Sequence, residues 1–465
     1  MSHSHNDIQP AFPAPEPDGS MAGPWSHTVR RANGELRVGG VKVSQLVATY
    51  GTPLYVIDEE DFRTRARRWV AAMNASFADL AGARVFYACK ALMSVGIARW
   101  VLEDGLALDT CSEGEFVTAL AAGAKGYDIG LHGNNKSERE IMMALEHNIS
   151  HMVVDSMAEL RFVERIAENL GKRANIVLRV TAGVHAGGHE FISTAHEDQK
   201  FGLSIQGGQA WEATQATVAS PHLELVGLHS HIGSQILSVD AFSVAAKAVL
   251  DLRACIHNEL TCTVPELDLG GGYGIRYTGA DATPPEPEAY AELLATVVRA
   301  HGEKTGIAHP LVSIEPGRSI VGPAGLTLYT VGTTKNVQLD DTHSRRYVSV
   351  DGGMSDNIRP ALYDAQYTVA VANREARGEG TLSRVVGKHC ESGDIVVHNV
   401  ELPADVTAGD ILATPATGAY GRVMASNYNM LSRPGVVAVH DGSSRVLIRR
   451  ETVADQLALD ADYQA

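Results

Sequence analysis

The stretch VFYACKAL, residues 85–92, ends an apolar and aromatic run with one charged side chain, Lys90. Seven more short apolar runs follow it, and the first four of the eight begin at residues 85, 106, 129 and 151. Segments between them, such as EGEFVTALAAG, have the apolar spacing of helices. Regular alternation of strand and helix predicts βα units, and eight units predict a closed TIM-like (β/α)₈ barrel. The predicted strands are 85–89, 106–110, 129–133, 151–155, 176–180, 225–233, 266–272 and 311–317.

After about residue 323 the sequence changes to alternating β-branched segments, which predict a second, all-β domain of sandwich or barrel type. Asp441-Gly442 lies between two such segments and predicts a hairpin turn. The segment 34–58 also has β character and is predicted to pair with this domain as its N-terminal strand. The predicted boundaries are a disordered head at 1–22, an N-terminal segment joining the β domain at 23–59, the barrel at 60–323, the β domain at 324–454 and a tail at 455–465.

Composition narrows the class of protein further. A chain of 465 residues exceeds one ordinary domain, and its net charge of -16 works against general binding to nucleic-acid phosphates. No apolar stretch is long enough to cross a bilayer, and the N-terminus lacks a secretory signal. The five cysteines are odd in number and none forms a C-x-x-C pair, which indicates reduced thiols and a cytoplasmic protein.

The polar, Gly-rich segment 183–202 has the composition of a functional loop.

Polar residues follow most of the predicted barrel strands. In barrels of this type the loops at the carboxyl ends of the strands build the active site, so these side chains are expected to meet at one edge. Scattered surface charges would have no reason to fall at the same position in each unit. The set comprises Lys90, Asp109, His132, Asp155, His231, Gly233, Ser234, Gly270, Gly271, Gly272, Glu315, Gly317 and Arg318.

Several of these residues also allow a purely structural interpretation. The triple glycine at 270–272 forms either a tight turn or a phosphate-binding loop, and its place after a late barrel strand favours phosphate. His231 is either a site residue or a core histidine. A lone lysine is usually solvated, but desolvation of Lys90 beside Phe86 and Tyr87 would lower its pKa, as a nucleophilic amine requires.

Eight motifs resemble those of the fold type III pyridoxal-phosphate decarboxylases, and specifically of the branch that acts on diaminopimelate. The resemblance extends from about residue 35 to 452. It implies a barrel that binds pyridoxal 5'-phosphate, a β domain, no metal, and a homodimer whose subunits share active sites. The motifs are YACK (87–90), HGNNKS (132–137), HSHIGSQI (229–236), DLGGG (268–272), EPGR (315–318), DGGMSDNIRPALY (351–363), GKHCESGD (387–394) and GAYGRVMASNYN (418–429).

Roles carried over from the family concern the cofactor first. The resemblance implies that Lys90 is the Schiff-base lysine, that His231 stacks on the cofactor ring, and that Glu315 faces the pyridine nitrogen. Loss of CO₂ leaves an electron pair that the protonated ring accepts, so a carboxylate at that nitrogen suits the chemistry. The implied cofactor-binding residues are Lys90, Asp109, His231, Ser234, Gly272, Glu315, Gly317, Arg318 and Tyr420.

The same resemblance assigns the substrate end of the site and the catalytic acid. Cys390 is implied to donate the proton that replaces CO₂, and polar neighbours in GKHCESGD make apolar burial of this cysteine less expected. The implied substrate-binding residues are Arg318, Arg359, Tyr363, Glu391 and Tyr420. Guanidinium forks suit the distal carboxylate that distinguishes diaminopimelate from its product, lysine.

Alternatives within the family remain open at this point. A decarboxylase of ornithine, arginine or a carboxylated polyamine shares the barrel and the coenzyme. Outside enzymes, a non-catalytic regulatory homologue is the other candidate, although such a protein would not need Lys90, Glu315 and Cys390 together. The reaction that the resemblance implies is decarboxylation of meso-2,6-diaminopimelate to L-lysine and CO₂, and this is the expected activity.

Overall fold

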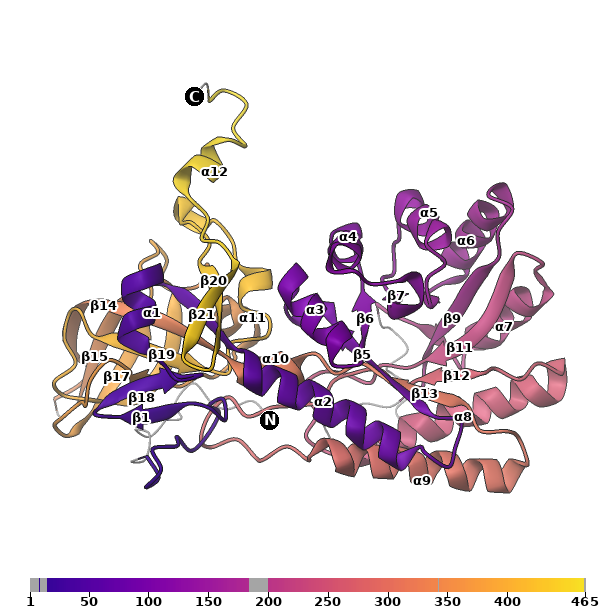
Figure 1. Cartoon of the computed structure of the whole chain (residues 1–465), viewed down its shortest axis with the longest axis horizontal. Coiled ribbons are helices and arrows are strands. Elements are labelled where there is room, and N and C mark those ends of the chain that lie inside the picture. The colour runs from indigo at the N-terminus through magenta and orange to yellow at the C-terminus, as the bar shows by residue number, and fades with distance from the viewer. Residues whose placement is uncertain (1–7, 9–14, 184–199, 342, 464–465) are drawn as a thin grey trace. The chain divides into compact units, whose positions relative to one another are not determined.

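The structure is a computed structural model that describes residue 8 and residues 15–183, 200–341 and 343–463. The described residues form two compact units, coloured by chain position in Figure 1. The barrel unit comprises those of Arg65–Gly274 and Pro284–Gly317, and the β unit comprises those of Met1–Thr64, Ile275–Thr283 and Arg318–Ala465. The exact domain boundaries expected from the sequence stay predictions. Most of the expected disordered head (1–7 and 9–14) and most of the loop 183–202 (184–199) lie outside the described residues.

Eight parallel strands close into a barrel, which confirms the predicted fold. Each strand pairs with its neighbours in chain order, and pairing of β13 with β5 closes the ring. All four residues of β6 and of β8 are buried, so each short apolar run packs on both of its faces. Every predicted run overlaps one strand: β5 (Ala83–Ala88), β6 (Ala107–Thr110), β7 (Ile129–Leu131), β8 (His151–Val154), β9 (Ala174–Thr181), β11 (Leu223–His229), β12 (Glu266–Asp268) and β13 (Leu311–Ile314).

Helices lie outside the strand ring (Figure 1), and four consecutive ones begin at a serine. Ser94, Ser112, Ser137 and Ser156 each accept a hydrogen bond from the backbone N–H three residues later. Such caps satisfy N–H groups that the first helical turn leaves without partners. They begin α3 (Val95–Glu103), α4 (Glu113–Ala122), α5 (Glu138–Glu146) and α6 (Met157–Asn169).

The remaining elements within residues 59–314 are further helices, two short 3₁₀ turns and the two-residue strand β10. They are α2 (Glu59–Ser76), η1 (Cys89–Ala91), η2 (Gly126–Asp128), β10 (Leu203–Ser204), α7 (Gln209–Ala219), α8 (Asp240–Leu260) and α9 (Pro287–Thr305). None of the helices within the described ranges combines the length and apolar composition needed to span a membrane.

The β unit is built on one long sheet, in the order β18-β17-β15-β14-β4-β20-β21. Strand β4 comes from the N-terminal segment and pairs with both β14 and β20, which confirms the predicted N-terminal contribution. The strands are β1 (Arg30–Ala32), β2 (Glu35–Val38), β3 (Val41–Lys42), β4 (Leu54–Asp58), β14 (Gly325–Gln338), β15 (Ser344–Val350), β16 (Ala370–Val371), β17 (Gly380–Val386), β18 (Ile395–Pro403), β19 (Ile411–Pro415), β20 (Gly435–His440) and β21 (Ser443–Ile448). Short helices complete the unit: α10 (Arg318–Ala324), α11 (Arg359–Tyr363), η4 (Arg422–Met424), η5 (Tyr428–Met430) and α12 (Val453–Leu457).

Local sequence explains two features of this unit. Asp441 and Gly442 have φ values of 45° and 73° between β20 and β21, so the predicted hairpin is confirmed. The expectation of β character throughout 34–58 is wrong for one part, because Val43–Tyr50 forms the helix α1. Val43 and Leu46 are buried three residues apart, which is a helical and not a strand spacing. Gly51, with φ 68°, ends this helix.

Candidate active site

The carboxyl edge of the barrel gathers the predicted cofactor residues of the barrel unit. Lys90 lies in η1 directly after β5, Asp109 is in β6, and Glu315 follows β13. Burial raises the pKa of Asp109, the charge of Glu315 adds to this, and the Lys90 ammonium opposes it. Burial and then the same ammonium lower the pKa of His231 to about 3. Ala88 is the strand partner of Asp109, so Lys90, two residues later, lies at the same carboxyl edge of the barrel as Asp109.

Lys90 itself differs from expectation in one respect. The residues before it, Val85 to Cys89, are buried, but the Lys90 side chain is exposed. The prediction that Phe86 and Tyr87 desolvate this ammonium is therefore wrong. The physical reason is that η1 turns the backbone out of the strand direction immediately before Lys90. The amine is thus accessible to a ligand at the mouth of the barrel.

Glu315 is the centre of a buried polar cluster. Its Oε1 lies 3.1 Å from His132 Nε2 and 3.3 Å from His229 Nε2, yet makes no hydrogen bond of good geometry. Burial alone would raise the pKa of Glu315, but the two histidines outweigh it and hold the pKa well below its ordinary value. Burial raises the pKa of Asp268 and lowers that of His132 to about 3. The cluster thus holds one ionised carboxylate among groups that burial drives toward neutrality.

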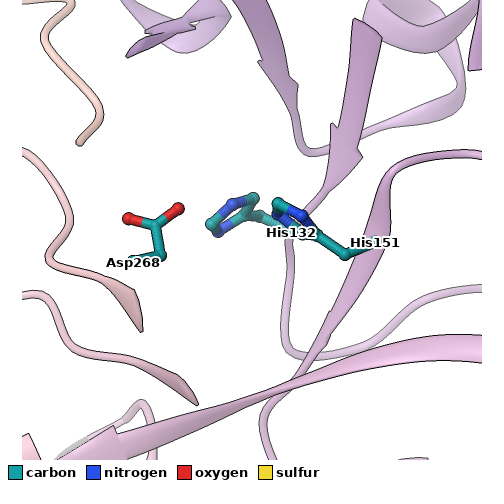
Figure 2. Close-up of side chains that lie close together, drawn as sticks. All are labelled: His132, His151 and Asp268. Carbon is teal, nitrogen blue, oxygen red and sulfur yellow. The ribbon is translucent and has the colours of Figure 1, made fainter. Parts of the chain in front are cut away.

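A second group of side chains lies beside His132. Figure 2 shows His132, His151 and Asp268 pointing toward one another. His151 Nε2 and Asp268 Oδ2 are buried without a hydrogen-bond partner. Two sets of side chains each have their possible ligand atoms within 4.8 Å of one another. One set is His132, His151 and Asp268, and the other is His132, His229 and Glu315. Donors of these types bind metals as well as protons, so the expected absence of a metal stays a prediction.

The triple glycine forms a turn in which side chains have no room. A Cβ on Gly271 would lie 2.4 Å from the Glu315 carbonyl oxygen, and one on Gly272 would lie 2.4 Å from that of Gly233. Gly272 also has φ 107°, a conformation that L side chains rarely adopt. The backbone N–H of Gly271 donates to His231 Nδ1 at 3.2 Å, which fixes this ring beside the turn. These contacts join the segments that follow β11, β12 and β13.

Gly317 and Ser234 complete the predicted cofactor residues of the barrel unit. A Cβ on Gly317 would lie 2.8 Å from Ala88 Cβ, so the backbone after β13 passes close to the end of β5. Ser234 is exposed in the loop that follows β11. Both residues therefore lie at the carboxyl edge, as the strand positions predicted.

In the β unit the predicted arginines stack on tyrosines. Arg318 lies over the rings of Tyr277 and Tyr420, with its guanidinium carbon 5.8 Å and 4.7 Å from their centroids. Arg359 lies 4.7 Å from the Tyr277 ring and donates to the hydroxyl of Tyr367. The shared ring of Tyr277 brings the two guanidinium groups together although 41 residues separate their positions in the sequence. Planar cations held in this way are suited to carboxylates and phosphates.

The other predicted residues of this unit are exposed. Tyr363 ends α11 and is 61% exposed. Cys390 and Glu391 lie in a turn between β17 and β18, and both are exposed. The interpretation of Cys390 as a buried small thiol is therefore wrong, as its polar neighbours in the sequence indicated.

Sequence reasoning missed several residues of the site. His229 and Asp268 are the last residues of β11 and β12, and His151 is the first residue of β8, so all three lie within the apolar runs that predicted the strands. Their sequence signal was an ionisable side chain within an otherwise apolar run. Burial of such a group costs free energy unless a partner or a functional role compensates for it. Tyr277 gave no such signal, because its role depends on chain segments distant in sequence.

Comparison with known proteins agrees with this geometry. The model of the pyridoxal-dependent decarboxylase family, pyridoxal binding domain, matches residues 59–322. The diaminopimelate decarboxylase of Corynebacterium efficiens is 48% identical, covering 93% of each chain, and that of Mycobacterium tuberculosis is 48% identical, covering 93% of this chain and 96% of the relative. A crystal structure of diaminopimelate decarboxylase from M. jannaschii in complex with L-lysine has a TM-score of 0.88 at 31% identity, covering 94% and 98%.

Barrel, glycine turn and buried carboxylate thus define the class, a pyridoxal-dependent decarboxylase of fold type III. Within that class the two 48% identical relatives extend over both the barrel and the β unit. This chain belongs to the diaminopimelate decarboxylase family.

Proposed function

We propose that the chain decarboxylates meso-2,6-diaminopimelate to L-lysine and CO₂ with pyridoxal 5'-phosphate as coenzyme. The observation that carries this proposal is the gathering of Lys90, His231 and Glu315 at one edge of the barrel, in a chain 48% identical to named diaminopimelate decarboxylases. A crystal structure of lysine/ornithine decarboxylase from Vibrio vulnificus is only 21% identical, so its likeness shows the fold alone.

The residues present fit this coenzyme. Glu315 has a buried Oε1 without a good hydrogen bond, and its low pKa keeps it anionic, as a protonated pyridine nitrogen requires. Glycine at 271 and 272 lets the turn pack against the carbonyls of Glu315 and Gly233, and the side-chain-free Gly272 is the member of the turn proposed to contact the phosphate. Lys90 offers an accessible amine at the carboxyl edge of the barrel. When bound, the pyridinium ring supplies the sink for the electron pair left at the substrate Cα by departing CO₂.

Each barrel residue then has a defined task. Lys90 holds the coenzyme through Nζ, and Glu315 keeps the ring nitrogen protonated by charge pairing. His231 is neutral because its pKa is about 3, and its ring is fixed by the N–H of Gly271, so it presents a flat face for stacking. Ser234, Gly272 and Gly317 are proposed phosphate contacts, together with Tyr420 of the β unit. Asp109, whose pKa burial raises, is a proposed neighbour of the ring.

The substrate's two ends require separate recognition. Arg318 and Arg359, held on the Tyr277 ring, are proposed to bind the carboxylates, with Tyr363, Glu391 and Tyr420 as further substrate contacts. A site built for a second carboxylate leaves an arginine unmatched when lysine binds, so the product is not a good substrate.

Cys390 is proposed to give its proton to Cα after CO₂ leaves. Because Cys390 and Glu391 are exposed on a turn of the β unit, we propose that they complete the barrel site of a second subunit in a homodimer. All five cysteines lie in the described ranges as free thiols, which supports the proposal that the enzyme works in the reducing cytoplasm.

The decisive experiment measures CO₂ release from meso-diaminopimelate beside ornithine, arginine and lysine. We expect kcat/KM for meso-diaminopimelate to exceed each of the others by about 10⁴-fold, because a buried charged site rejects ligands that leave it unpaired. A preference for ornithine or arginine would contradict the assignment of Arg318 and Arg359. Addition of pyridoxal phosphate to coenzyme-depleted protein should restore the activity.

A further inference from the structure

The turn that carries Cys390 is exposed at its tip and buried at its base. Cys390 and Glu391 are exposed, whereas His389 is 8% and Asp394 is 3% exposed. A thiol on an unsupported loop would occupy many positions, and proton transfer depends on one of them. The hydrogen bonds at the base of the turn therefore decide where the thiol lies.

Asp394 closes the base of the turn. Its Oδ2 accepts from the backbone N–H of His389 at 2.8 Å, and its Oδ1 accepts from that of Met354 at 2.6 Å. A Cβ at Gly353 or Gly387 would lie 2.3 Å or 2.2 Å from these oxygens, so backbone packs directly against the carboxylate. The turn is thus joined to the segment that follows β15.

The hydrogen bonds of His389 determine its tautomer. Its Nε2 lies 3.3 Å from the backbone nitrogen of Ser355 and 2.8 Å from Ser355 Oγ. A backbone N–H can only donate, so Nε2 accepts and the proton is on Nδ1. Nδ1 then donates to Asn429 Oδ1 at 3.1 Å. The same oxygen accepts the backbone N–H of Cys390 at 3.2 Å.

Asn429 Oδ1 therefore accepts two hydrogen bonds, one from the His389 imidazole and one from the backbone N–H of Cys390. Asn429 has φ 54°, a left-handed conformation that asparagine adopts more readily than most residues. The ring of the preceding Tyr428 stacks on His389, with centroids 5.2 Å apart. The segment around Asn429 thus braces the turn from a part of the chain 39 residues away.

We propose that Asn429 and His389 are positioning residues that fix the Cys390 thiol for proton delivery, with Asp394 anchoring the turn. This inference rests on the proposed role of Cys390 as the acid. In that step the S–H bond breaks, the proton forms a C–H bond at the substrate Cα, and the thiolate regains a proton from water. Asn429 acts only through Cys390 and touches no reacting atom.

A double-mutant cycle tests the proposal in the holoenzyme. Asn429→Gly removes the acceptor oxygen while tolerating the left-handed backbone, and Asn429→Asp keeps an acceptor oxygen. We expect Asn429→Gly to lower kcat about 10-fold with KM within about 2-fold, and to raise the solvent deuterium isotope effect on kcat, because the proton step becomes slower. Asn429→Asp should restore kcat to within about 2-fold of wild type. In a Cys390→Ala background, Asn429→Gly should change nothing further.

Asn33 provides a matched control. It is exposed in the same unit, has the same φ of 54°, and lies in the turn between β1 and β2. Asn33→Gly should leave kcat and the isotope effect unchanged. An equal loss from Asn429→Gly with and without Cys390 would overturn the inference alone. Wild-type rates in Cys390→Ala would instead overturn the acid assignment in the proposed function, and the inference with it.

Discussion

In the barrel unit, Lys90, Asp109 and Glu315 owe their places to strand register, since each lies at or just after the end of a hydrogen-bonded strand. In the β unit, Cys390 owes its place to two side chains that accept backbone hydrogen bonds: Asp394 accepts from the N–H of His389, and Asn429 accepts from that of Cys390. A barrel strand is fixed by many backbone bonds and by burial on both faces, so one lost side chain leaves it in place. A turn held by a few side-chain hydrogen bonds moves when one of those side chains is removed. Predicted effects of substitutions therefore differ in kind between the two units.

Lys90→Ala should have the largest effect. Loss of the amine removes the covalent anchor for the coenzyme, so we expect activity to fall by at least about 10⁴-fold. The visible absorbance band of lysine-bound coenzyme should disappear with it. Lys304→Ala, at an exposed position in α9, should retain both activity and spectrum. An unchanged spectrum in Lys90→Ala would mean that another amine holds the coenzyme.

Two buried acids of the barrel provide a matched pair. Glu315 has a pKa well below its ordinary value, whereas burial raises that of Asp109. Glu315→Gln removes a charge and should lower kcat about 10²- to 10³-fold, while Asp109→Asn, at a carboxyl whose raised pKa favours its uncharged form, should cost less than about 10-fold. Steady-state kinetics of coenzyme-saturated variants provide the comparison. The reverse order of effects would show that Asp109, and not Glu315, is the carboxylate that acts on the ring.

The pH dependence of the unfolding free energy tests the buried carboxyl of Asp356 in the β unit. Burial raises the pKa of this carboxyl from an ordinary 3.8 to about 7, although Tyr329 and the N–H of Gly353 donate to it. A folded group with a raised pKa contributes stability that is complete below the unfolded pKa and is lost as pH rises through the folded pKa. Over that range the wild type should therefore lose about 2–4 kcal/mol relative to Asp356→Asn, which cannot titrate.

Urea unfolding at a series of pH values measures this slope for both proteins. Asp462→Asn, at an exposed position, serves as the control and should keep the wild-type slope. Parallel curves for wild type and Asp356→Asn would show that Asp356 stays ionised in the folded chain.

Ser156→Ala should have the smallest effect. It removes the hydrogen bond to the Glu159 N–H at the start of α6 and should cost about 1 kcal/mol of unfolding free energy. For a unit of this size that is a fall of about 2–4 °C in Tm, measured by differential scanning fluorimetry. We expect kcat to stay within about 2-fold of wild type, because strand register and not this cap positions the site. A tenfold fall in kcat would contradict that distinction.

The barrel and much of its site could be predicted from sequence because local pattern and global position coincide there. Apolar runs mark strands, and a residue after a run must lie at the carboxyl edge. The prediction failed where tertiary contact decides. His229 and Asp268 lie inside runs, Val43–Tyr50 is a helix within a β-rich segment, and the exposure of Lys90 depends on the turn that follows β5.

Sequence alone determined the eight strands, the carboxyl-edge residues, the N-terminal strand of the β unit and the family motifs. Each of these depends on periodicity or on short runs of residues that a neighbouring segment cannot alter. Only the tertiary structure decided that Tyr277 joins two arginines, that His132 and His229 keep Glu315 ionised, and that Asn429 braces the Cys390 turn. These features depend on distances between segments far apart in the chain, and electrostatics and hydrogen bonds are set by those distances.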